Sequence, residues 1–126
     1  MKVRGTDFVV YQVSDMDRSI EYYRDTLGME LEGYYEEFGW AEFTATPTTL
    51  ALVDPAKFEE GAKPRPGGAS IALAVEDVKA AVEELKGKGI KVYMDAMESP
   101  VCWYALVADP DGNLVGLHAR KDGTFG

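Results

Sequence analysis

The hydrophobic pattern of the first half of the chain predicts one strand, one helix and three further strands. Residues 7–13 are largely apolar and β-branched, which is typical of a strand. The apolar residues of positions 16–27 recur at helical spacing, with Ser14 as the predicted N-cap and Gly28 as the end of the helix. The three later strands are expected at Glu30–Tyr35, Trp40–Ala45 and Leu50–Val53, with turns at residues 38–39 and 46–48.

The second half repeats this plan after a connector rich in proline and glycine. Residues 70–75 form an apolar strand, and Asp77 can cap a helix that ends at Gly87 and Gly89. Three more strands are expected at Lys91–Met94, Cys102–Ala108 and Leu114–Ala119, the last two joined by a turn at residues 109–113. An offset of about 62 residues superposes Val13 on Val75 and Asp15 on Asp77, so we predict an internal duplication.

The length of 126 residues fits one domain, for which we predict a module at about residues 5–56, a connector at 57–68 and a second module at 69–120. The net charge of -9 argues against nucleic acid and anionic membranes as partners. No apolar run approaches the roughly 20 residues of a membrane span, and the first residues lack the apolar block of a signal peptide. We therefore expect a cytoplasmic protein. Cys102 and His118 are the only residues of their kinds.

Two segments carry a resemblance to a known family. The run Val13–Tyr23 with Leu27-Gly28-Met29, and the later run Ala108–Leu114, resemble the vicinal oxygen chelate superfamily. That group includes glyoxalase I, the bleomycin and fosfomycin resistance proteins and the extradiol dioxygenases. The resemblance implies an α+β fold of two tandem βαβββ modules, whose curved mixed sheets surround a cleft, usually in a homodimer. It does not choose a chemistry, because one fold hosts many functions.

The resemblance also implies where a metal would bind. Metal-dependent members carry a ligand, usually His, Gln or Glu, on the first and last strand of each module. The matching positions in this chain are Phe8, Ala51, Ser70 and Gly116. None of these side chains offers the imidazole or carboxylate that a divalent cation needs there, and a register slip of one residue at Ala51 would bring only leucine. We therefore expect no metal of the family type and no other cofactor.

Strand parity predicts which side chains line the cleft, because alternate residues of a strand share a face. In the second module Leu106 is expected to pair with Gly116 and Tyr104 with His118, while Cys102 lies farther along the same face. In the first module Thr44 is expected to pair with Ala51, which places Glu42 and Trp40 on the cleft face, and Gln12 shares the face of Phe8. The predicted ligand-binding residues are Phe8, Gln12, Trp40, Glu42, Cys102, Tyr104 and His118.

Glu42 and His118 are the candidate acid–base residues of this set. A carboxylate facing the cleft needs water, His118 or a bound cation as its partner. Trp40 and Tyr104 suit stacking on a planar or cationic ligand, although core packing explains them equally well. Cys102 fits a small buried hydrophobe, since a reactive thiolate needs a nearby positive charge.

Three functions follow from these residues. The leading hypothesis is a metal-independent protein that binds an aromatic or cationic small molecule, similar to the drug-sequestering branch of the superfamily. The second is a metal-independent lyase or isomerase in which Glu42 or His118 moves a proton and Tyr104 orients the substrate. The third is an enzyme with an unconventional metal site at His118, Cys102 and Glu42.

Overall fold

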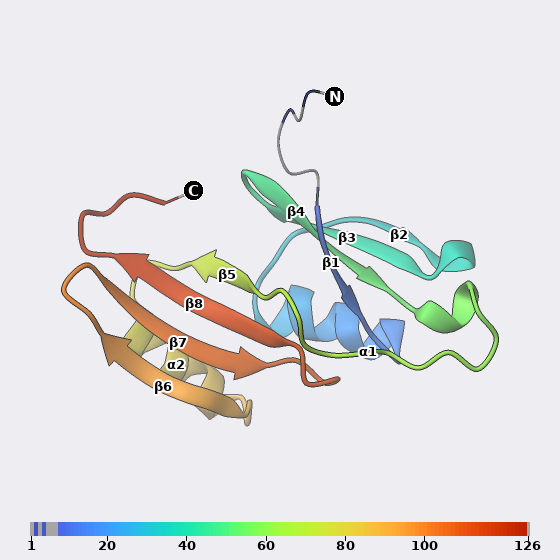
Figure 1. Cartoon of the computed structure of the whole chain (residues 1–126). Helices are drawn as coiled ribbons and strands as arrows, with labels where there is room; N and C mark the ends of the chain where they lie inside the picture. Colours follow the sequence, from blue (N-terminus) through green and yellow to red (C-terminus); the bar gives the residue numbers. More distant parts are fainter. Residues whose placement is uncertain (1, 3, 5–7, 126) are drawn as a thin grey trace. The chain divides into compact units, whose positions relative to one another are not determined.

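The computed structural model describes residues 2, 4 and 8–125, and the chain forms two compact units, residues 1–66 and 67–126. Each unit holds a four-stranded mixed sheet with a helix packed on one face (Figure 1). The strand orders are β1-β4-β3-β2 and β5-β8-β7-β6, so each unit repeats the same βαβββ plan. The predicted α+β fold of two tandem βαβββ modules is confirmed at this level.

The first unit begins with a parallel pair, in which β1 lies against β4, and continues with antiparallel pairs. Its elements are β1 (Val9–Gln12), α1 (Met16–Glu21), a π-helical turn η1 (Tyr22–Thr26), β2 (Leu31–Tyr35), a 3-10 turn η2 (Glu36–Phe38), β3 (Trp40–Ala45), β4 (Thr48–Val53) and a 3-10 turn η3 (Pro55–Lys57). The core lies between the helix and the sheet, where Tyr23 packs against Phe43 with ring centroids 5.7 Å apart.

The entry to the first helix differs by one residue from the prediction. Asp15, not Ser14, is the N-cap, because its carboxylate accepts a hydrogen bond of 3.0 Å from the backbone N–H of Arg18. The Ser14 hydroxyl instead accepts a bond of 3.0 Å from the Arg18 guanidinium. Asp77 caps the second helix as predicted, through the N–H of Ala80 at 3.0 Å. The two caps stand at the matching positions of the duplication.

The predicted helix over residues 16–27 is α-helical only as far as Glu21. It continues as the π-helical turn, in which the N–H of Leu27 bonds the carbonyl of Tyr22 at 2.9 Å, five residues back. Both Tyr22 and Tyr23, adjacent in sequence, are buried in this wider turn. Gly28 ends it with a φ of 76°, as the sequence predicted.

The register of β3 with β4 also differs from the prediction. Thr44 pairs with Thr49, and Ala51 pairs with Glu42. The predicted turn includes Thr48, whereas β4 starts at this residue and only Thr46 and Pro47 connect the strands. The error in pairing is two residues, so every side chain keeps its predicted face.

The second unit has β5 parallel to β8 and antiparallel pairs beyond it. Its elements are β5 (Ile71–Ala74), α2 (Val78–Gly87), β6 (Val92–Glu98), β7 (Cys102–Ala108) and β8 (Leu114–Arg120). Val82, Val107 and Val115 are fully buried between the helix and the sheet. In the described part of the chain, no helix has the length and hydrophobicity needed to cross a membrane.

Strand β6 runs to Glu98, four residues beyond its predicted end at Met94. Register shifts on both sides of Met94 interrupt the alternation by which a strand is recognised in sequence. Two acidic residues in the added part form ion pairs, Asp95 with Lys86 at 2.8 Å and Glu98 with Lys121 at 2.6 Å. The paired ammonium groups hold the pKa values of both carboxyls below their ordinary values.

Candidate functional site

In each unit the sheet face opposite the helix is the candidate binding surface; we call these the first and second open faces. In β3, Ala41 and Phe43 are fully buried on the helix side, so Trp40, Glu42 and Thr44 project from the first open face. In β7, Ala105 and Val107 are buried on the helix side, so the even-numbered residues project from the second. Each predicted ligand-binding residue within a described strand therefore lies on the expected face of its own unit.

The first open face carries an aromatic pair held by a carboxylate. Phe8 and Trp40 meet edge to face, with ring centroids 5.3 Å apart and an interplanar angle of 84°. The indole N–H of Trp40 donates to Oε1 of Glu42 at 2.9 Å. The partner of Glu42 in the structure is therefore the Trp40 indole. This hydrogen bond fixes the plane of the Trp40 ring on the open face.

Gln12 takes part in a contact that the sequence did not predict. Its side-chain oxygen accepts a hydrogen bond of 2.9 Å from the backbone N–H of Arg65, in the connector after the first module. The side chain thereby ties the connector to the end of β1. This gives Gln12 a structural role, while its role in ligand binding stays a prediction.

The second open face is built around Tyr104. The predicted pairs Tyr104–His118 and Leu106–Gly116 are confirmed by the strand register. The rings of Tyr104 and His118 lie 6.0 Å apart at 70°, and the phenol covers Gly116. A Cβ added at Gly116 would lie 2.8 Å from the Tyr104 hydroxyl oxygen and 3.1 Å from the Cβ of Ala72. The phenol therefore occupies the space that a side chain at position 116 would need.

Cys102 lies at the start of β7 on the same face, half-buried. Its Sγ lies 3.2 Å from the hydroxyl of Ser99, which also accepts from the backbone N–H of Cys102 at 3.0 Å. The cysteine thus forms part of the tight turn that joins β6 to β7.

The four positions that correspond to family metal ligands do not fit a metal ion. Ala51 lies in β4 and Gly116 in β8, whereas Phe8 and Ser70 stand one residue before β1 and β5 and not within those strands as predicted. They present phenyl, methyl, hydroxymethyl and hydrogen side chains. Among residues 2, 4 and 8–125, no group of three or more His, Cys, Asp and Glu side chains is placed to hold a metal. The metal site proposed at His118, Cys102 and Glu42 stays a hypothesis.

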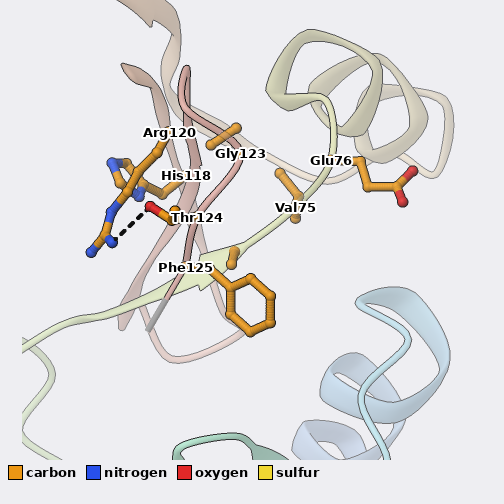
Figure 2. A pocket seen from close by; sticks show the side chains of 9 residues that line it. Val75, Glu76, His118, Arg120, Gly123, Thr124 and Phe125 are labelled. Atoms are coloured by element: carbon orange, nitrogen blue, oxygen red, sulfur yellow. Dashed lines mark hydrogen bonds between the residues drawn. The ribbon is translucent and has the colours of Figure 1, made fainter. Parts of the chain in front are cut away.

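A hollow of about 440 Å³ opens beside His118 in the second unit (Figure 2). Its walls come from the ends of β5 and β8 and from the residues that follow each of these strands: Ala74, Val75, Glu76, His118, Ala119, Arg120, Gly123, Thr124 and Phe125. The Arg120 guanidinium donates to the Thr124 hydroxyl at 3.3 Å, and Thr124 bonds the carboxylate of Asp122 at 2.7 Å. These bonds hold the terminal segment across the end of the sheet.

A second hollow, of about 330 Å³, is lined by aromatic side chains of the first unit, Tyr35, Phe38, Trp40 and Phe58. We call it the aromatic pocket. Of its residues, only Trp40 is among those predicted from the sequence to bind a ligand. Phe38 lies in η2 and Phe58 directly after η3, where strand parity does not apply. The available signal was the presence of aromatic residues in turns, where they have no core to fill.

Comparison with known proteins agrees with this architecture. Residues 5–117 match the model of the Glyoxalase/Bleomycin resistance protein/Dioxygenase superfamily. The chain therefore belongs to this superfamily, the group that the sequence resembled.

Three relatives give the range of similarity. A probable chloroplastic lactoylglutathione lyase of Arabidopsis thaliana is 35% identical over 89% of this chain, which spans only 35% of that protein. A probable lactoylglutathione lyase of Synechocystis is 31% identical, over 88% of this chain and 94% of its own length. The solved structure of TnmS3, an antibiotic binding protein from Streptomyces sp. CB03234, matches with a TM-score of 0.77 and 26% identity, covering 96% of this chain and 99% of that one.

Proposed function

We propose that this protein binds a small molecule on its open faces without a metal ion, as a cytoplasmic homodimer. The observation that carries the proposal is the identity of the residues at the four positions where metal-dependent members of the family have ligands. These residues are Phe8, Ala51, Ser70 and Gly116. None of them has a donor suited to a divalent cation, and at Gly116 the Tyr104 phenol leaves no room for one.

The residues on the open faces suit binding. Phe8, Trp40 and Tyr104 offer ring surfaces, and the contacts of Trp40 with Glu42 and Phe8 hold one of these rings in place. Such preorganisation lowers the entropy lost when a ligand binds. TnmS3, with the same fold, is described as an antibiotic binding protein, which supports ligand sequestration as the activity.

The test is ligand binding in the absence of metal. Protein treated with EDTA and untreated protein are screened by thermal shift against one library of aromatic and cationic compounds. We expect the same saturable ligands in both samples, because a ligand present at roughly 100 Kd stabilises the folded state by about 2.7 kcal/mol whether or not a metal was removed.

Elemental analysis of the untreated protein supplies the control for this screen. Stoichiometric zinc, iron or nickel, together with a lower melting temperature after EDTA, would contradict the proposal. A complete absence of saturable ligands in both samples would contradict it as well.

A second candidate function is a metal-independent lyase or isomerase. The named activity of the two plant and cyanobacterial relatives favours it, as does the position of His118 in the wall of the hollow. In this scheme Glu42 or His118 moves a proton. The alternative is tested by assaying lactoylglutathione lyase activity in the EDTA-treated protein and in His118→Ala.

We expect no turnover from either sample, because the leading proposal requires none. The lyase would replace it if the EDTA-treated protein were active and His118→Ala lowered kcat by about 10²–10⁴-fold, the usual contribution of a general acid–base. Val101→Ala, which changes a side chain that is 72% exposed in the same unit and is not among the predicted ligand-binding residues, is the matched control and is expected to keep any activity found.

A further inference from the structure

Most of the rings that line the aromatic pocket of the first unit are largely exposed to solvent, so they do not serve to fill the core. Tyr35, Phe38 and Phe58 are 50%, 58% and 69% exposed, yet together with Trp40 they line one hollow of about 330 Å³. Large apolar side chains that gather at the surface mark binding sites more often than isolated ones do. The rings come from β2, η2, β3 and the segment after η3, so the pocket belongs to the fold and not to one loop.

Backbone contacts bring these segments together. Gly39, with a φ of 58°, ends η2, and its carbonyl accepts from the N–H of Asp54 at 2.8 Å. Asp54 in turn caps η3 by accepting from the N–H of Ala56 at 3.0 Å. The turn that carries Phe38 is therefore tied to the turn that precedes Phe58. Trp40, the fourth residue of the lining, is held by Glu42 and by Phe8.

The charge around the pocket is strongly negative. Residues 30–60 contain eight acidic side chains and one basic side chain, Lys57, for a net charge of -7. Tyr35 also lines an adjoining hollow with Glu36, Glu37 and Lys57, so two acidic residues and one basic residue lie beside the pocket. Burial, together with nearby carboxylates such as Asp17 and Glu36, raises the pKa of Tyr34. Anionic ligands are disfavoured in such surroundings, and cations are favoured.

We propose that the aromatic pocket binds an organic cation, an alkylated ammonium group seated among the rings of Tyr35, Phe38, Trp40 and Phe58. The proposal rests on the small-molecule binding function above and names the ligand class and the site. Aromatic faces attract cations by about 0.5–2 kcal/mol per contact, and rings on several sides recognise quaternary ammonium groups. The chain already makes one such contact, between the Lys79 ammonium and the Trp103 ring at 4.2 Å.

The test compares two probes of nearly equal size, choline and its uncharged carbon analogue 3,3-dimethylbutanol. The chain has two tryptophans, so isotope-labelled protein gives two indole N–H signals in nuclear magnetic resonance spectra. We expect choline to shift the Trp40 signal saturably and to leave the Trp103 signal in place. The neutral probe should bind about tenfold more weakly, corresponding to about 1.4 kcal/mol. Equal affinity of the two probes, or no saturable shift of Trp40, would overturn the proposal.

Matched variants locate the site. Phe58→Leu removes an exposed ring of the pocket, and Tyr93→Leu removes a comparable ring, 63% exposed, from the second unit. Both variants should keep the melting temperature of the unaltered chain, because neither ring is buried. Phe58→Leu should weaken choline binding several-fold and Tyr93→Leu should not. If the two variants bound choline with equal affinity, the proposal that choline binds in the aromatic pocket would be wrong.

The two proposals fail in distinguishable ways. If library compounds bind the EDTA-treated protein but choline leaves the Trp40 signal unchanged, the cation pocket is wrong and metal-independent binding stands. If choline shifts Trp40 but the purified protein holds stoichiometric metal, the cation pocket stands and the metal-independent function is wrong.

Discussion

Replacing Gly116 by alanine is expected to lower the free energy of unfolding of the second unit by about 1–3 kcal/mol, the usual cost of overpacking. The new Cβ would stand 2.8 Å from the Tyr104 hydroxyl oxygen, 2.9 Å from its Cε2 and 3.1 Å from the Cβ of Ala72. The Tyr104 ring can turn aside, but Ala72 belongs to the paired strand β5 and cannot. Denaturant unfolding, followed by circular dichroism, measures the change.

A double-mutant cycle shows whether Tyr104 is the cause. Gly116→Ala should cost less in a Tyr104→Ala background, with a coupling free energy of about 0.5–3 kcal/mol between the two positions. Gly87→Ala is the matched control, because this helical glycine has no atom within 4 Å of the added Cβ and should be neutral or stabilising. If Gly116→Ala were as harmless as Gly87→Ala, the phenol would not occupy position 116. The steric argument against a metal at Gly116 would then be lost, while the four positions would still lack metal-binding side chains.

The sequence predicted the sheet face of each side chain more accurately than the register in which the strands pair. The β7–β8 register was correct because the Asp109–Asn113 turn has an unmistakable composition, and its length fixes every pair beyond it. The β3–β4 register was wrong because Thr48 is equally acceptable in a turn and in a strand. Trp40 and Glu42 nevertheless kept their predicted face, since an even shift preserves parity.

The pattern of hydrophobic and polar residues did not predict most of the side-chain contacts at the candidate site. Strand parity placed Gln12 on a face but said nothing of its bond to Arg65, 53 residues away. The expected partner of Glu42 was water, His118 or a cation. The structure shows instead a hydrogen bond from the indole of Trp40, two residues away on the same strand. The aromatic pocket was missed because Phe38 and Phe58 approach each other only through the Gly39–Asp54 backbone contact. The Gln12–Arg65 bond and the aromatic pocket depend on tertiary structure, whereas the Trp40–Glu42 bond is local to β3.

Replacing Asp109 by alanine is expected to destabilise the second unit by about 3 kcal/mol or more. Asp109 is 5% exposed, and its carboxylate accepts hydrogen bonds from the N–H groups of Asp111 and Asn113 at 2.9 and 2.8 Å and from the Asn113 amide at 2.9 Å. Asn113 is itself buried, so its donors would lose a partner that water cannot readily replace. Each buried donor left without a partner costs about 1–3 kcal/mol.

Two variants separate the loss of hydrogen bonds from the loss of a charge. Asp109→Asn keeps one acceptor oxygen for the two backbone N–H groups, and a rotated Asn113 amide can accept from the new NH₂, so it should cost less than half as much as alanine. Asp122→Ala removes a carboxylate from an exposed turn in the same unit, where water can satisfy the freed donors of Thr124. Its effect should stay within about 0.5 kcal/mol. If Asp109→Ala fell in the same range, the buried turn would not hold β7 and β8 in register. The alignment of Tyr104 with His118 would then need another cause, since that pairing is counted outward from the turn.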